Sequence, residues 1–492
     1  MIRFLSLRRA VEAAPARATG ALWVLWVGAA LLAWPAGGRA APPGQGWALA
    51  WSDEFNGSSL DTSKWSVGTG SRRDAVNTAS AVSVGDGRLR IKTYTSGGTH
   101  YTGWVGTNGK MEECFGYWEA RIRFNSSAGM WSAFWLQSAG MGGVGDPAGD
   151  GTEIDVAEHR SQDSGGTNLQ NKYTINVHWD GYGSDHKSVG STIGNPGTNP
   201  ASLQGNFHTY GVLWAGDRYD FYLDGTWVWS TTAAVSSVRQ WIYLTSEVDS
   251  GAWAGSIPSG GYGSASSTST YFDVDYVRFY QQAERTVNGD FTNRMGPWRQ
   301  SGQVSWSSSG GVDGTPGVYL NPNTTSGSKA YMTVHGLLPN TPYVVRGVGD
   351  VGSRTWPDIR IGAENYGGPP VYGAVWSNGF SMALATFTTG ASNTTARVFA
   401  SVPTQWGTCY ADNIYLRRAW RCTNGGFEQG DALAWGLSGD CFVQDWGGSY
   451  RRSGSCALRL NASSAARGAE QTIYGLRAGT TYTLSGWVRT AG

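Results

Sequence analysis

Short runs of alternating apolar and polar residues, separated by glycine-rich turns, most constrain how this chain of 492 residues can fold. In the run 116–124, Trp118, Ala120, Ile122 and Phe124 alternate with more polar positions. A strand that buries one face has this period of two. The 72 glycines, about twice the usual share, supply turns, whereas helix-forming stretches are scarce. The pattern predicts an all-β chain of two to four domains, built as antiparallel β-sandwiches.

The charge balance limits the classes of partner. The formal net charge is +1, and only 15% of the residues are charged. This balance gives no electrostatic basis for binding nucleic acid or an anionic membrane surface. We therefore expect a neutral ligand and no nucleic-acid partner.

The first 40 residues have the composition of an export signal. Four arginines precede the apolar run 21–34, and a site of small residues follows at 38–40. The apolar run is too short to cross a bilayer comfortably, although an uncleaved anchor is the alternative. We expect residues 1–40 to be removed, and the mature protein to be secreted into the extracellular space without membrane attachment.

Four of the five cysteines lie beyond residue 400, where export would permit disulfide bonds. The predicted pairs are Cys441 with Cys456 or Cys409 with Cys422. Cys114 is alone in its part of the chain. We expect it to be a small, buried apolar residue rather than a nucleophile.

Three carboxylates lie within six residues of one strand-like run. On a strand, Glu153 and Asp155 share a face. Glu158 breaks this alternation, because a residue five positions beyond Glu153 should face the core. A β-bulge near Val156 and Ala157 would add one residue and bring all three acids onto one face.

Such a row of acids suits glycoside hydrolysis, which uses one carboxylate and one protonated carboxyl group. Retention of configuration needs the two groups roughly 5 to 5.5 Å apart. A bulged five-residue step covers about 13 Å between backbone positions, so two glutamates that lean inward over Asp155 can reach that separation. Taken alone, the six residues fit a solvated acidic strand equally well.

Aromatic and polar side chains near the acids suggest a polysaccharide cleft. A second alternating run places Trp131 and Trp135 on one face, and indole rings stack on the apolar face of a sugar. Core packing is the alternative. Downstream, His178 shares a face with Asn176 and could border the acids. Arg121, on the polar face of its strand, is a further candidate substrate contact.

Seven motifs follow one another between residues 51 and 277. They are Trp51-Ser-Asp-Glu-Phe, Gly116-Tyr-Trp-Glu-Ala-Arg-Ile, Gly129-Met-Trp-Ser-Ala-Phe-Trp-Leu, Glu153-Ile-Asp-Val-Ala-Glu, His208-Thr-Tyr-Gly-Val-Leu-Trp, Tyr222-Leu-Asp-Gly and Phe272-Asp-Val-Asp-Tyr-Val. In this order they resemble glycoside hydrolase family 16, which includes laminarinases, lichenases, agarases and carrageenases. The resemblance covers about half of the chain.

The resemblance implies a fold and a set of roles. Residues 46–281 would form a concave two-sheet jelly-roll β-sandwich that hydrolyses polysaccharide with retention, by endo-acting cleavage. Glu153 would be the nucleophile, Asp155 its supporting acid and Glu158 the general acid/base. The two residues between Asp155 and Glu158 resemble the bulged, laminarinase-like branch of the family.

Two further features bear on substrate and metal. The residues after the acids, His159-Arg160, differ from the continuation common in laminarinases, and a basic residue there also suits a sulfated galactan. Many family members carry a structural calcium, so the resemblance implies Ca²⁺ near Glu54 and Asp275. A hydrogen-bonded Asp275 is the alternative, and no cofactor is expected for catalysis.

The remainder of the chain contains a repeat. Asn288-Gly-Asp-Phe recurs as Asn424-Gly-Gly-Phe, a period of 136 residues. We expect residues 286–419 to form a β-sandwich that loosely resembles a jelly-roll carbohydrate-binding module. Its tryptophans, Trp376 among them, could stack on sugar or pack in the core. Residues 420–492 make an incomplete second copy, so either the sequence is a fragment or this copy cannot close its sandwich.

Together these features predict a monomeric, secreted, retaining endo-β-glycanase acting on β-1,3- or mixed β-1,3/1,4-glucan. Within the same class, the alternative is an endo-acting galactanase of the agarase or carrageenase kind. A non-catalytic glucan-binding protein and a wall-bound adhesion protein are alternatives from other classes. The presence of both Glu153 and Glu158 favours the enzyme.

Overall fold

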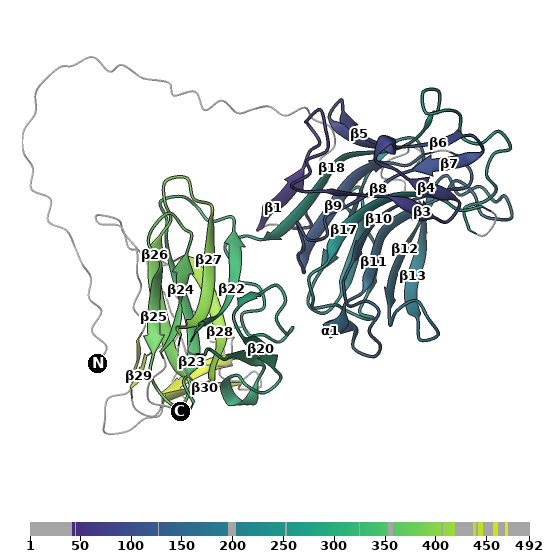
Figure 1. The fold of residues 1–492 in the computed structure, drawn as a ribbon. Helices are drawn as coiled ribbons and strands as arrows, with labels where there is room; N and C mark the ends of the chain where they lie inside the picture. Colours follow the sequence, from purple (N-terminus) through teal and green to yellow (C-terminus); the bar gives the residue numbers. More distant parts are fainter. Residues whose placement is uncertain are drawn as a thin grey trace, which may run out of the picture. The chain divides into compact units, whose positions relative to one another are not determined.

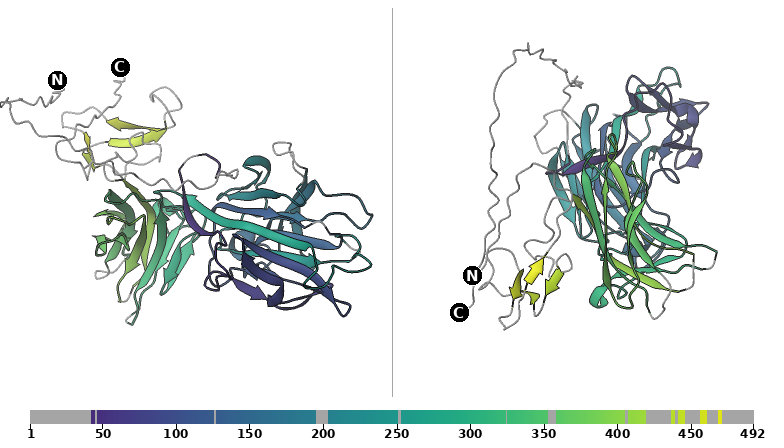
Figure 2. Two further views of the ribbon diagram at one scale, coloured as in Figure 1. Left: turned by 90° about the horizontal axis from the view of Figure 1, so that it is seen from above. Right: turned by 90° about the vertical axis from the view of Figure 1, so that its left-hand side faces the viewer.

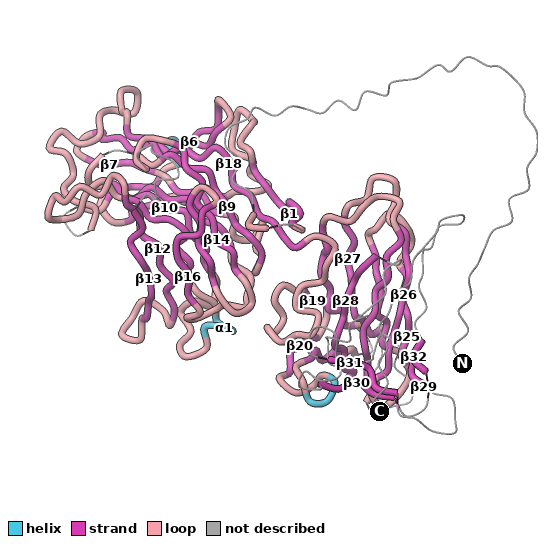
Figure 3. Tube along the Cα trace, turned by 180° about the vertical axis from the view of Figure 1, so that it is seen from behind, coloured by secondary structure: helices cyan, strands magenta, loops and turns pink. Residues whose placement is uncertain are grey.

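The structure is a computed structural model of the chain (Figure 1). It describes residues 42–44, 46–125, 127–194, 203–250, 253–323, 325–352, 358–404 and 407–418, and four short strands beyond them. Nearly all of the described elements are strands, as Figure 3 shows, which confirms the all-β prediction. The expected export signal at 1–40 lies outside the described residues.

Two stacked sheets form the first sandwich. The outer sheet has the order β16 (Thr226–Thr231), β15 (Tyr219–Leu223), β14 (Phe207–Trp214), β9 (Gly116–Arg123), β18 (Thr270–Gln282), β6 (Arg88–Ser96), β7 (Thr99–Thr102), β4 (Ala75–Asn77) and β3 (Gly70–Arg72), with β1 (Trp47–Asp53) on β18 and β5 (Val82–Gly85) on β6. The cleft sheet has the order β13 (Lys187–Gly194), β12 (Lys172–Trp179), β11 (Glu153–His159), β10 (Met130–Gln137), β17 (Trp241–Val248), β8 (Trp104–Gly106) and β2 (Ser66–Gly68).

The apolar residues of the alternating runs fill the space between these sheets. Trp118 and Val212 of the outer sheet and Phe134, Ile154 and Ile175 of the cleft sheet belong to one core cluster, and each is fully buried. Strand periodicity then directs the intervening residues of the cleft sheet away from the core. This second face is where the aromatic and acidic side chains lie.

A second sandwich follows, with its own core around Phe291, Trp298 and Tyr343. Two further views show its sheets in green (Figure 2). One sheet has the order β19 (Arg299–Ser301), β22 (Ser328–His335), β27 (Thr395–Val402), β24 (Ile359–Glu364) and β25 (Val371–Val375), and the other β20 (Val304–Ser307), β21 (Gly317–Leu320), β28 (Cys409–Arg418), β23 (Pro342–Asp350) and β26 (Ser381–Thr388).

Helical structure is limited to α1 (Pro147–Asp150) and the single 3₁₀ turns η1 (Ala79–Ala81) and η2 (Val312–Gly314) among the described residues. In that part of the chain no helix has the length and apolar character needed to cross a bilayer.

The last strands form two small ladders. They pair β29 (Gly436–Ser438) with β32 (Gly468–Glu470), and β30 (Cys441–Asp445) with β31 (Cys456–Leu460). Most of residues 420–492 lie outside the described residues, so the incomplete second copy stays a prediction.

The two predicted disulfide pairs are wrong. Cys409 is a free, buried thiol, so it is not bonded to Cys422. In the ladder of β30 and β31, Cys441 lies opposite Leu460, four residues from Cys456. That offset separates the two Cα atoms by about 13 Å, whereas a disulfide requires less than about 7 Å. Cys114 is buried and free, as expected.

Candidate active site

The predicted bulge is present in strand β11. Asp155 pairs with Asn176 of β12, and Glu158 pairs with Thr174, so three steps along β11 match two steps along β12. The register with β10 shifts at the same place. The extra residue restores the phase of the strand, and Glu158 lies on the same face as Glu153 and Asp155.

The three acids lie in a cleft of about 410 Å³ on the side of the cleft sheet that faces away from the core. Aromatic side chains and charged groups share its walls. It is lined by Arg72, Arg73, Trp104, Trp131, Ala133, Trp135, Gln137, Glu153, Asp155, Glu158, Tyr182, Tyr243, Thr245 and Glu247. The structure thus brings Trp131 and Trp135 together with the acids.

Glu158 is a buried carboxyl group with hydrogen-bond donors on both of its oxygens. The indole Nε1 of Trp131 donates to its Oε1 at 3.0 Å, and the amide Nδ2 of Asn176 donates to its Oε2 at 2.8 Å. Burial, followed by the charge of Asp155, raises the pKa of Glu158 to about 8. Near neutral pH this residue therefore retains its proton and can act as an acid.

Glu153 has a different environment. Its Oε2 accepts a hydrogen bond from Nε2 of Gln137 at 3.0 Å and another from the hydroxyl of Tyr182. Burial raises the pKa of Glu153 above its usual value, and the hydrogen bond from Tyr182 offsets part of this rise because the donor stabilises the anion. Two donors on one oxygen favour a carboxylate that can act as a nucleophile.

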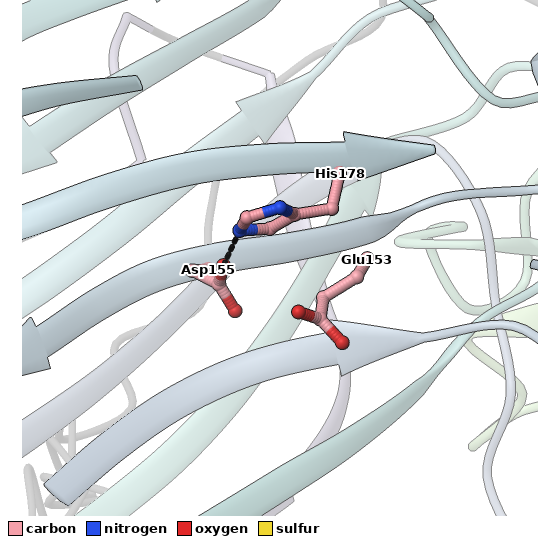
Figure 4. A group of neighbouring side chains, drawn as sticks. All are labelled: Glu153, Asp155 and His178. Carbon is pink, nitrogen blue, oxygen red and sulfur yellow. Dashed lines mark ion pairs between the residues drawn. The ribbon is translucent and has the colours of Figure 1, made fainter. Parts of the chain in front are cut away.

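Asp155 lies between the two glutamates along β11, and its side chain faces His178 near Glu153 (Figure 4). The residue is 4% exposed, and burial together with the charge of Glu153 holds the pKa of Asp155 well above its usual value. Nε2 of His178 lies 3.1 Å from Oδ2 of Asp155. On the other side of the ring, Nδ1 of His178 lies 2.9 Å from Nε2 of His186.

Arg121 does not reach the cleft. It lies on β9 of the outer sheet, where its Nη1 pairs with Oδ2 of Asp275 at 2.7 Å and its guanidinium group lies over the ring of Phe207. The sequence places Arg121 on a polar strand face, but this face belongs to the other sheet. The structure therefore removes it from the candidate substrate contacts.

The residues proposed for calcium do not fit a cation site. Glu54 accepts two hydrogen bonds from Arg278, at 2.9 and 2.7 Å, and Asp275 pairs with Arg121. Each carboxylate is therefore neutralised by its own arginine. The alternative stated for Asp275, a hydrogen-bonded carboxylate, matches the structure.

Arg160 also lies apart from the cleft lining. Its Nη1 donates to the backbone oxygen of Trp253, and its guanidinium group lies 3.9 Å from the centre of the Trp253 ring. The positive charges that line the cleft belong instead to Arg72 and Arg73.

Sequence reasoning missed several residues of the cleft. Gln137 could have been found, because it shares the period-two face of Trp131 and Trp135. Tyr182 follows β12 in a loop, and Arg73 lies in the turn after β3, so no local periodicity relates them to the acids. Only the folded chain shows that they line the same cleft.

A two-sheet sandwich with an aromatic cleft and paired glutamates in contrasting environments defines a glycoside hydrolase. Comparisons with known proteins agree. A family model described as Beta-porphyranase A-D, GH16 domain, matches residues 47–282. The keratan-sulfate endo-1,4-beta-galactosidase of Sphingobacterium multivorum is 31% identical over 391 residues, which covers 75% of this chain and 86% of that protein.

Two further similarities extend the comparison. The glucan endo-1,3-beta-glucosidase A1 of Niallia circulans is 27% identical over 271 residues, 48% of this chain and 38% of that protein. The solved endo-beta-1,3-glucanase of Pyrococcus furiosus is 25% identical with a TM-score of 0.39, covering 48% of this chain and 94% of that one. This chain belongs to glycoside hydrolase family 16 and is an endo-acting glycanase.

Proposed function

We propose that this chain is a secreted, retaining endo-β-galactanase that cleaves a β-galactan carrying anionic groups such as sulfate. The observation that carries the substrate class is a pair of arginines, Arg72 and Arg73, beside the tryptophans of the cleft. The export-like composition of residues 1–40 supports secretion. N-terminal sequencing of the protein recovered from the medium tests that part of the proposal.

The retaining mechanism assigns different tasks to the two glutamates. Glu153, held by two donors as the anion, attacks the anomeric carbon and forms a glycosyl ester. Glu158, whose raised pKa keeps it protonated, gives its proton to the leaving glycosidic oxygen. The same carboxylate then removes a proton from water, and that water hydrolyses the ester and releases Glu153.

Asp155 assists this exchange through its own protonation state. Its raised pKa favours the protonated form, which can donate a hydrogen bond to the carboxylate of Glu153. His178 approaches Asp155 from strand β12 and limits the positions its carboxyl group can take. Asp155 and His178 therefore orient and tune Glu153, whereas the aromatic side chains of the cleft contact the sugar.

The arginine pair supports an anionic substrate. The Nε atoms of Arg72 and Arg73 donate to the two oxygens of Glu247, and the side chains are 42% and 36% exposed. Within the described part of the chain, neither arginine uses its Nη groups in a hydrogen bond. Guanidinium groups bind sulfate through paired N–H donors. Arg73 also lies 4.2 Å from the centre of the Trp131 ring, beside a surface on which a sugar can stack.

One relative and the matching family model favour the same substrate class. The relative aligned over most of its length cleaves keratan sulfate at β-1,4-galactosidic bonds, as its name states, and the matching family model is named for porphyranases. A neutral β-glucan is the second candidate. It is favoured by the aromatic wall in which Tyr243 packs against Trp135 and Trp104, at ring distances of 4.7 and 4.9 Å.

A panel of polysaccharides tests substrate and mechanism together. The panel contains keratan sulfate, porphyran, their chemically desulfated forms, agarose, laminarin and lichenan. We expect reducing ends from a sulfated galactan, fewer from its desulfated form, and initial products of β configuration by NMR. Glu153→Gln and Glu158→Gln should each lose most turnover, at least about a hundredfold. Products of α configuration, or cleavage of laminarin alone, would contradict the proposal.

A further inference from the structure

We propose that Glu153, Asp155 and His178 form a second kind of site in the same cleft, a binding site for a divalent transition-metal ion such as Zn²⁺ that reversibly blocks catalysis. The binding site rests on the positions of these three side chains. The block on catalysis rests additionally on the nucleophile role proposed above for Glu153.

The three ligand atoms converge from two neighbouring strands. One atom from each side chain lies within 4.8 Å of the other two. The register of β11 and β12 places Glu153 opposite His178, and Figure 4 shows the imidazole directed at Asp155. Ligands at about 2.0–2.2 Å from a tetrahedral Zn²⁺ are roughly 3.3–3.6 Å apart. The pair Asp155–His178 already has a shorter separation, 3.1 Å, and the longer side chain of Glu153 needs to move by only about 1 Å to complete the site.

An unsatisfied atom points independently to a cation. Oδ2 of Asp155 is buried and accepts no hydrogen bond from the described residues, although Nε2 of His178 is close. When Nδ1 of His178 carries the proton and donates to His186, and the proton of Asp155 is on its other oxygen, facing Glu153, the lone pair of Nε2 faces Oδ2. Two acceptors then face each other at 3.1 Å, an unfavourable contact that a bridging cation would convert into two bonds.

The surroundings resemble those that support metal ligands. An imidazole that binds a metal usually donates its other N–H to a neighbour, and His186 offers that acceptor to His178. Gln137 and Tyr182 donate to Glu153 and orient its carboxylate. One nitrogen and two carboxylate ligands with an open position suit Zn²⁺, whereas Ca²⁺ prefers six to eight oxygens.

A bound ion and a substrate exclude each other at this site. A lone pair of Glu153 that coordinates the metal is not available to attack the anomeric carbon. The ion would also occupy the space between the cleft walls where that carbon must lie. The enzyme would therefore be inactive in the metal-bound form and recover when the metal is removed.

Metal binding to the full chain is measured directly, by titration with Co²⁺ followed by visible absorption and with Zn²⁺ by calorimetry. We expect one ion per chain, and the Co²⁺ spectrum of a four- or five-coordinate site. Asp155→Asn and His178→Gln should abolish this binding, and His186→Gln should weaken it about tenfold. Glu158→Gln and His100→Gln, which alter an acid and a histidine outside the trio, should bind like the wild type.

Inhibition is measured separately. Zn²⁺ should inhibit the wild type competitively with the polysaccharide, and EDTA should restore full turnover. Absence of stoichiometric Co²⁺ binding, or unchanged binding in both Asp155→Asn and His178→Gln, would overturn the site. Co²⁺ absorption does not depend on turnover, so the two hypotheses can fail separately. If the chain binds Co²⁺ but Glu153→Gln remains active, the nucleophile role is rejected and the metal site stands.

Discussion

At the scale of single residues, hydrogen-bond donors distinguish two chemically identical side chains. Both oxygens of Glu158 have a donor, yet burial and the neighbouring Asp155 keep the pKa of Glu158 high. Both donors of Glu153 act on one oxygen. The residue types in the sequence predict an acid pair, and these contacts favour Glu158 as the carboxyl group that holds the proton.

The pH dependence of kcat/KM follows from Glu158. Activity needs its protonated form, so the rate should fall as pH rises through its pKa of about 8. Asn176 stabilises the anion and lowers that pKa. We therefore predict that Asn176→Ala moves the alkaline limb to higher pH. An equivalent change at the exposed Asn321 of the second sandwich should leave the profile unchanged, and a limb that moved to lower pH in Asn176→Ala would contradict the assignment.

At the scale of elements, the bulge in β11 decides whether the row of acids works. Alternation predicts that Glu153 and Asp155 share a face, and the broken alternation at Glu158 predicts the bulge. These inferences succeed because the two faces of a strand follow from local geometry. The faces of β9 were equally predictable, but the sheet to which β9 belongs was not, and the prediction for Arg121 failed for that reason.

The bulge makes a specific prediction about chain length in β11. Deleting Ala157 removes the extra residue, and regular alternation then keeps Glu158 on the cleft face. Exchanging Ala157 and Glu158 with each other should instead place the carboxyl group at a position that is fully buried in the core, where an unpaired carboxyl group is costly. We expect measurable turnover from the deletion variant and none from the exchanged variant, assayed by release of reducing ends. A folded, active exchanged variant would show that the bulge does not set the face.

At the scale of the whole molecule, the second sandwich has its own core and its own exposed aromatic residues. Trp298 is buried in that core, which excludes it from sugar stacking, whereas Trp376 after β25 is 66% exposed and Tyr372 is 48% exposed. An exposed tryptophan four residues after an exposed tyrosine suits a polysaccharide surface.

We predict that Trp376→Ala reduces retention of the full chain on insoluble polysaccharide by about fivefold, which corresponds to the loss of about 1 kcal/mol of ring stacking. Turnover of soluble oligosaccharides should not change. The control is Trp227→Ala, since Trp227 is 55% exposed on β16 of the outer sheet. Pull-down measurements that show equal retention for the two variants would indicate that Trp376 does not bind the polymer.

The sequence by itself determined the strands, the face on which each side chain lies, the bulge and the row of acids, because period-two alternation is a local property of the backbone. Tertiary structure decided which separate segments meet. It placed Arg72, Arg73 and Tyr182 around the acids, paired Glu54 and Asp275 with arginines, and set Cys441 and Cys456 at opposite ends of a ladder. These outcomes depend on sheet order and loop packing, which local periodicity does not encode.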